Sequence, residues 1–254
     1  MRPDRTVDVA PERLAGWLDR FAAAHGPLHW DAAPETVVVV AADGAVARCT
    51  VPFPPLHPDP ELHPELHPDP EPAFGGLIAH ACAHRVVGVL FVRRGGFAVG
   101  VFDGDVLTAS KVGARQVQGR SAAGGWSQQR FARRREQQAR QAFDAAAGHA
   151  VRVWAPHAGR FDAVVTGGDR AAAADVLACV LADLTRDRGS GRLAEVPVVF
   201  LPGVPEPRQR VLLEAPRRYR AVRVAVTDPP ATVPAEPFAG PDTDASGRRV
   251  TPSR

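Results

Sequence analysis

The sequence contains few cysteines and no long apolar run. Its three cysteines are far apart and lie in apolar sequence: Cys49, Cys82 and Cys179. An odd number of scattered cysteines favours buried free thiols over disulfides or a metal site. No apolar run approaches the roughly 20 residues that cross a bilayer, and the residues after Met1 form no signal-peptide core. We therefore expect a cytoplasmic protein that does not contact a membrane and needs no metal or cofactor.

The sequence also lacks a set of carboxylates arranged for metal catalysis. Four aspartates lie near predicted turns: Asp103, Asp105, Asp162 and Asp169. They form no spaced cluster matched to strands, which two-metal chemistry would need. Asp169 follows two glycines and precedes an alanine-rich segment, so it is more simply a helix N-cap than part of an anion site. We do not expect metal-dependent cleavage.

One segment has almost no acids. Residues 111–140 contain eight basic residues and one acid, Glu136, a local net charge of +7 in a chain of net charge +3. Because arginines without acidic partners repel one another, an external polyanion such as RNA explains this charge better than internal ion pairs. The alternative is the solvated face of an ordinary amphipathic helix. At helical spacing one face gathers these residues: Arg130, Arg133, Arg134, Gln137, Arg140 and Gln141.

A loop at residues 119–130 precedes this helix. It is rich in glycine and small polar residues, so we expect it to stand away from the core. Ser127 is a suitable N-cap, which places Gln128 and Gln129 in the exposed first turn. The helix could continue to Trp154, or Gly148 could end it, with a strand following.

At these residues the chain resembles a known family. The run from Gly124 to Arg135, Gly-Gly-Trp-Ser-Gln-Gln-Arg-Phe-Ala-Arg-Arg-Arg, is similar to the signature of bacterial, chiefly actinobacterial, relatives of eukaryotic-type translation release factors. That group is allied to the Vms-type peptidyl-tRNA hydrolases of ribosome quality control. The resemblance covers roughly residues 77–226 and implies an RNase H-like domain that carries a glutamine loop into the peptidyl-transferase centre of the large ribosomal subunit.

The resemblance also implies roles for single residues. Gly125-Trp126-Ser127-Gln128 fits a Gly-x-x-Gln pattern, so Gln128 is the candidate catalytic glutamine, with Gly124 and Gly125 assisting and Gln129 as the alternative register. A neutral amide can orient water and donate to an oxyanion, which suffices for an activated ester. We expect tRNA or ribosomal RNA to contact the surrounding arginines: Arg115, Arg120, Arg130, Arg133, Arg134 and Arg140.

In chain order the sequence predicts an α/β protein, with a mixed α+β sheet, in four regions. These are a small N-terminal unit of one helix and a hairpin (1–54), an acidic Pro- and His-rich linker (55–73), a release-factor-like catalytic domain (74–226) and a disordered tail (227–254). In the linker His57, His63 and His67 each precede proline, so a converging metal site is not expected.

Hydrophobic periodicity places the elements of these regions. Helices are predicted at 11–25, 74–83, 170–184 and 208–215, and strands at 36–41, 45–51, 86–92, 97–102, 106–117, 161–166, 196–201 and 219–226.

The function that these features favour is hydrolysis of peptidyl-tRNA on stalled ribosomal complexes. Two alternatives remain at this stage: a nuclease that cuts the tRNA acceptor end, and a non-catalytic ribosome- or RNA-binding factor that uses the same basic helix.

Overall fold

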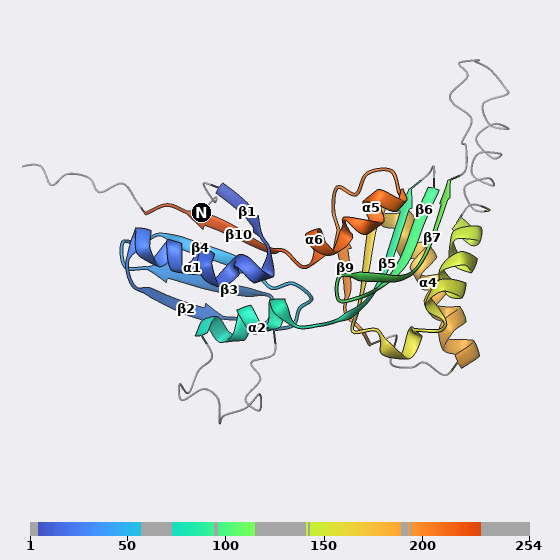
Figure 1. The fold of residues 1–254 in the computed structure, drawn as a ribbon, viewed down its shortest axis with the longest axis horizontal. Helices are drawn as coiled ribbons and strands as arrows, with labels where there is room; N and C mark the ends of the chain where they lie inside the picture. Colours follow the sequence, from blue (N-terminus) through green and yellow to red (C-terminus); the bar gives the residue numbers. More distant parts are fainter. Residues whose placement is uncertain are drawn as a thin grey trace, which may run out of the picture.

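The computed structural model describes residues 5–56, 73–93, 96–114, 141, 143–188, 193 and 195–229. Within these ranges the strands form two five-stranded sheets, which Figure 1 shows in separate halves of the molecule. Most of the predicted linker and the tail from residue 230 lie outside the described residues. None of the described helices is long and apolar enough to cross a membrane.

The N-terminal unit is an antiparallel sheet in the order β1-β10-β4-β3-β2. Its elements are β1 (Arg5–Val9), α1 (Pro11–His25), β2 (Leu28–Ala32), β3 (Thr36–Ala41), β4 (Val46–Thr50), η1 (Ala73–Gly76), α2 (Leu77–Cys82) and β10 (Val222–Thr227). The predicted helix at 11–25 and the hairpin around Asp43-Gly44 are confirmed. Leu14, Leu18 and Phe21 of α1 are buried against one face of this sheet.

The predicted boundaries of this unit were wrong in two places. Strand β10 was assigned to the catalytic domain, yet it pairs with β1 and β4 and buries Val222, Val224 and Val226 in the N-terminal core. A strand with alternating apolar residues fits a sheet covered on one face, whereas the other sheet is covered on both. Helix α2 also packs on the N-terminal core, through Leu77 and Ala81, rather than on the catalytic domain.

The central unit is a mixed sheet in the order β7-β6-β5-β8-β9. Its elements are β5 (Val86–Arg93), β6 (Gly96–Asp103), β7 (Val106–Ala114), a helix at 143–154, η2 (Ala158–Arg160), β8 (Ala163–Gly168), α4 (Arg170–Arg188), β9 (Val198–Leu201), α5 (Gln209–Leu213) and α6 (Ala215–Tyr219). Strands β5, β6 and β7 form an antiparallel meander, and β8 and β9 run parallel to β5. The predicted α/β class with a mixed sheet is confirmed.

Helices cover both faces of this central sheet. The helix at 143–154 and α4 pack on one face, around Trp154 and Val99, while α5 and α6 pack on the other, around Phe102 and Leu212. This explains why β5 is apolar from Val86 to Val92, since the side chains in this range meet a helix layer on one face of the sheet or the other. Gly148 does not end the helix, and residues 150–154 are helical rather than extended.

The two units meet through a small set of contacts. Arg220 precedes β10 and donates to Glu12 of α1 at 2.7 Å and to Asp105 of the β6–β7 turn. The Phe53 ring, which follows β4, packs edge-on against Tyr219 of α6 at 5.6 Å between centroids. The chain therefore crosses between the units twice, once between α2 and β5 and once between α6 and β10.

The prediction of three buried thiols was right for only one. All three cysteines are free, but Cys82 and Cys179 are exposed. Cys179 lies on the outer face of α4, where alanine neighbours do not imply burial. Cys49 is buried in the N-terminal sheet, and burial raises the pKa of its thiol to about 12, which makes it unreactive at neutral pH.

Candidate functional site

The predicted catalytic and RNA-binding residues belong to the connection between β7 and the helix at 143–154. They lie outside the described residues: Arg115, Arg120, Gly124, Gly125, Gln128, Gln129, Arg130, Arg133, Arg134 and Arg140. What the structure defines is the pair of elements on which this connection begins and ends. The ends are Ala114, which pairs with Gly96 across the sheet, and the helix that is continuous from residue 143.

The β7 end is held by an aromatic ring on the neighbouring strand. Phe97 and Gly113 are cross-strand partners, and a Cβ built on Gly113 would lie only 2.3 Å from Cε1 of Phe97. Glycine is therefore required at this position, because the Phe97 ring occupies the space that any side chain would fill. The ring and the glycine backbone fix the last residues of β7 against β6.

The same ring contacts the helix at the other end of the connection. Phe97 stacks on His149 with 5.2 Å between ring centroids and an interplanar angle of 22°. One side chain of β6 thus touches both elements that flank the predicted loop. Neither contact follows from local sequence pattern, because residues 97, 113 and 149 are far apart in the chain, and sequence reasoning missed both.

Deeper in the central unit, Trp154 fixes the C-terminal part of this helix. Its side chain is fully buried and its Nε1–H donates to the carbonyl oxygen of Gly100 at 3.1 Å. The ring edge lies against Gly88, where a Cβ would come within 3.2 Å of two ring atoms. A buried indole with its N–H satisfied is a rigid anchor, so the helix is fixed on β5 and β6.

The flanking elements carry two basic side chains and one exposed acid, Asp144 on the helix. Lys111 on β7 is exposed, as is Arg152 on the helix, which donates from Nη2 to Nδ1 of His149 at 2.8 Å. Burial, and then the positive charges of Arg152 and Lys111, lower the pKa of His149. His149 is therefore neutral at pH 7, and an acceptor Nδ1 suits the Arg152 donor. Lys111 belongs to the basic segment 111–140, whereas on the described helix the charges of Arg152 and Asp144 balance.

The four aspartates considered for metal chemistry all have structural partners. Asp103 bonds His84 at 2.5 Å and Arg160 at 3.2 Å; Asp162 accepts from the backbone of Val86 at 2.7 Å; Asp105 pairs with Arg220. Asp169 accepts from Ala172 N–H at 3.2 Å, so its predicted role as N-cap of α4 is confirmed. No group of three or more His, Cys, Asp or Glu side chains suited to a metal occurs among the described residues.

Taken together, the flanking elements can present a loop from a fixed base. Phe97 contacts both β7 and the helix at 143–154, and the buried Trp154 fixes that helix on the sheet. These contacts restrict the directions in which the connection can leave the sheet. This arrangement suits a loop that must reach into a partner while its base keeps a constant geometry.

A comparison with protein families gives a match to the central unit. The family model described as Actinobacteria/chloroflexi VLRF1 release factor matches residues 85–225, which is more than half of the chain. The match begins just before β5, ends in β10 and runs through the segment from Gly124 to Gln128. No curated protein matches the chain.

Proposed function

Because the chain belongs to the Actinobacteria/chloroflexi VLRF1 release factor family, we propose that it releases peptides from tRNA on stalled ribosomal complexes in the cytoplasm. The reaction is hydrolysis of the peptidyl-tRNA ester. Water adds to the carbonyl carbon, the ester C–O bond breaks, and a proton passes to the ribose oxygen of the tRNA. The observation that supports this proposal is the shared anchor of Phe97, which fixes both flanks of the Gly-x-x-Gln segment on one sheet edge.

In this proposal Gln128 orients the attacking water through its amide, which offers both a donor and an acceptor. Gly124 and Gly125 let the backbone approach the ester closely, so their N–H groups can stabilise the developing oxyanion. Gln129 is the alternative if the loop enters in the neighbouring register. A strong base is unnecessary, because the ester is already activated and positioning supplies most of the rate.

The basic surface supplies the affinity for RNA. Arg115, Arg120, Arg130, Arg133, Arg134 and Arg140 surround the candidate glutamine in sequence. Lys111 extends this charge onto β7, whereas on the helix Arg152 is offset by Asp144; all three side chains are exposed. Contacts of this kind hold phosphates without reading sequence, so binding should weaken steeply with salt. We propose tRNA and the large-subunit peptidyl-transferase centre as the partners.

The test is peptide release from stalled ribosome–nascent chain complexes. Gln128→Ala should lower the release rate by about 10²-fold, the usual cost of losing a group that stabilises the transition state, and should leave ribosome affinity unchanged. Gln209→Ala is the matched control, because Gln209 is an exposed helical glutamine of α5, on the opposite face of the central sheet from the helix at 143–154. The combined change Arg133→Ala and Arg134→Ala should lower the affinity for the ribosome and make that affinity fall less steeply with salt.

The tRNA product is examined in the same experiment. An intact 3′ end with release lost only in Gln128→Ala supports ester hydrolysis, and loss with Gln129→Ala instead moves the catalytic glutamine by one residue. A shortened tRNA would replace the proposal with acceptor-end cleavage. Salt-sensitive ribosome binding without release by any version would leave a non-catalytic binding factor.

A further inference from the structure

Two exposed arginines bind the backbone of the short segment at the end of β9, residues 200–204. Arg93, the last residue of β5, donates from Nη1 to the carbonyl oxygen of Val204 at 3.2 Å. Arg218 of α6 donates from Nη2 to the carbonyl oxygen of Pro202 at 2.5 Å. Each guanidinium is therefore held in place by a neutral acceptor, which leaves its charge uncompensated.

A third exposed arginine reaches the same segment from another element. Arg170, the first residue of α4, lies over the Phe200 ring, with 3.8 Å between its Cζ and the ring centroid. Four residue steps lead from Phe200 to Val204, and an extended chain covers about 3.3–3.6 Å per step, so the three guanidiniums contact a stretch of at most about 14 Å. We call these residues the edge arginines: Arg93, Arg170 and Arg218.

The edge arginines lack acidic partners. Among the residues that the structure describes, no carboxylate forms an ion pair with any of the three. Two exposed acids are close to them in sequence, Asp169 and Glu206, and the Asp169 carboxylate accepts from the Ala172 N–H as the N-cap of α4. Arg208 follows Glu206 and is exposed as well. Around this segment four arginines thus stand against two acids.

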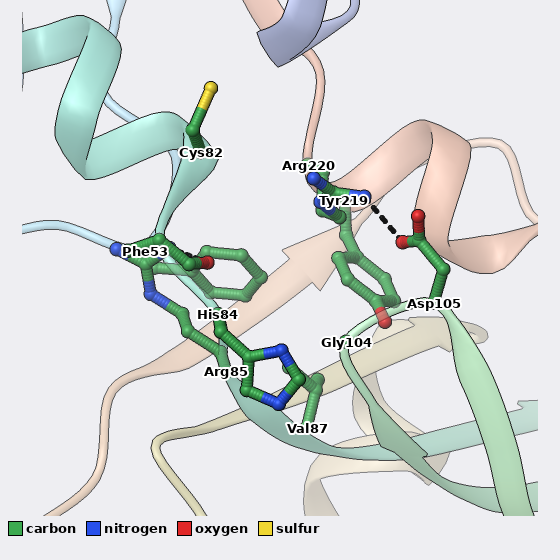
Figure 2. Close-up of a pocket in the computed structure, with 10 residues that line it drawn as sticks. Phe53, Cys82, His84, Arg85, Val87, Gly104, Asp105, Tyr219 and Arg220 are labelled. Atoms are coloured by element: carbon green, nitrogen blue, oxygen red, sulfur yellow. Dashed lines mark hydrogen bonds and ion pairs between the residues drawn. The ribbon is translucent and has the colours of Figure 1, made fainter.

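The opposite edge of the central sheet has a different arrangement of charge. A pocket of about 170 Å³ lies there, where the two units meet, and Figure 2 shows its side chains, which come from five separate segments. In its wall Arg220 is paired with Asp105, and His84 bonds Asp103. At that edge carboxylates of the β6–β7 turn offset these positive groups, whereas the edge arginines have no such partner.

The edge arginines lie at the sheet edge from which the predicted glutamine loop leaves. Strands β5 and β7 both run antiparallel to β6, and β8 and β9 run parallel to β5, so the C-terminal ends of β5, β7, β8 and β9 share one edge. Arg93 pairs with Gly96, which pairs with Ala114. Two strand spacings, about 10 Å, therefore separate the backbone of Arg93 from the start of the loop.

We propose that the edge arginines bind the phosphate backbone of the tRNA acceptor stem. This inference rests on the proposed function, which brings the 3′ end of the peptidyl-tRNA to the loop, because the acceptor stem is the duplex that leads to that end. A guanidinium has five N–H donors and binds phosphate oxygens through its fork. A duplex carries one phosphate per roughly 3.4 Å of axis on each strand, so a stretch of about 14 Å faces several phosphates.

The experiment measures the affinity of the full-length protein for free deacylated tRNA, by fluorescence anisotropy, at salt concentrations from about 50 to 200 mM. The test variant combines three substitutions: Arg93→Gln, Arg170→Gln and Arg218→Gln. It should bind tRNA at least about 10-fold more weakly, and the slope of log affinity against log salt should become shallower by about 2–3, because each lost phosphate contact removes about 0.9. An RNA hairpin that reproduces only the acceptor stem should show the same change of slope.

A matched control removes the same amount of charge elsewhere. It combines substitutions at three exposed arginines of the N-terminal unit: Arg13→Gln, Arg20→Gln and Arg48→Gln. This control should keep the slope of the natural sequence, because a local contact and not net charge is what we propose. Lysine at all three edge positions retains the charges and should retain the slope as well. If the triple glutamine variant does not fold, each single glutamine variant should lower the slope by about 0.9.

An unchanged slope in the test variant, or an equal change in the control, would overturn the proposal. A weaker affinity for the large ribosomal subunit with unchanged affinity for tRNA would overturn the assignment to tRNA. Binding requires no peptide release, and Gln128→Ala should bind tRNA as tightly as the natural sequence. Failure of the proposed function therefore appears as absent release with the change of slope retained, whereas failure of this inference appears as release with no change of slope.

Discussion

The close fit of Trp154 against Gly88 predicts that two destabilising substitutions compensate one another. A Cβ on Gly88 would lie 3.2 Å from Cε2 and Cζ2 of Trp154 and 3.3 Å from Cε2 of Phe161. Trp154 cannot move away freely, because its N–H is bonded to Gly100 and its ring is fully buried. Gly88→Ala should therefore destabilise the protein by about 1–3 kcal/mol, the usual cost of overpacking a core.

Trp154→Phe destabilises for the opposite reason. It removes a hydrogen bond that contributes about 1 kcal/mol and opens a cavity, for a combined loss of roughly 2–4 kcal/mol. The smaller ring also lacks the atoms nearest to Gly88. In the Trp154→Phe background the added methyl of Gly88→Ala should meet only Phe161 and fill part of the space. We expect the double variant to lose about 1 kcal/mol less unfolding free energy than the sum of the losses in the two single variants.

Thermal and urea unfolding of the four proteins, followed by circular dichroism, measure this coupling. For a chain of this length 1 kcal/mol corresponds to about 2–4 °C in melting temperature. If the loss in unfolding free energy of the double variant equals the sum of the single losses to within about 0.5 kcal/mol, the two residues do not constrain one another. The contact that we describe beneath the predicted loop would then be refuted.

Two further outcomes follow from single side chains. Tyr219→Phe should raise stability by up to about 1 kcal/mol, because it removes a buried hydroxyl that has no partner among the described residues; a clear fall in melting temperature would contradict this. The Ala45 N–H and then the His25 ring hold the pKa of Asp43 below its ordinary 3.8, so the ionised carboxylate stabilises the fold above that pH, and this stabilisation is lost as pH falls through the lowered pKa. Asp43→Asn should accordingly lower the melting temperature at pH 7 and make no difference in strong acid, and a constant deficit across pH would count against the charge.

Local signals in the sequence predicted the elements that are stabilised locally. Asp43-Gly44 specifies the β3–β4 hairpin by its turn chemistry, and the apolar stripe of residues 11–25 specifies α1. Edge strands β1 and β2 were missed, because exposed residues such as His29 and Asp31 give them no clear alternation. Pairing with neighbours, rather than composition, makes these segments extended.

The long-range arrangement could not be read from local pattern. The alternating valines of β10 showed that it was a half-buried strand, but not which sheet it would join. At the candidate site, the signature residues were accessible to sequence reasoning, whereas the Phe97 contacts with Gly113 and His149 depend on the register of the meander. The pocket at the meeting of the units was equally invisible, since its walls come from five separate segments.

The return of β10 to the N-terminal sheet means that the central unit is inserted within the sequence of the N-terminal unit. The N-terminal unit begins at β1 and is completed by a strand more than two hundred residues later. Its sheet can therefore assemble only after the central unit has been synthesised. Truncation to the family-matched region would leave the remaining part of β10 with neither of its partners and would expose Val222 and Val224 along an unpaired strand, which favours aggregation. The release-factor unit should therefore be excised before β10, at the crossing that follows α6.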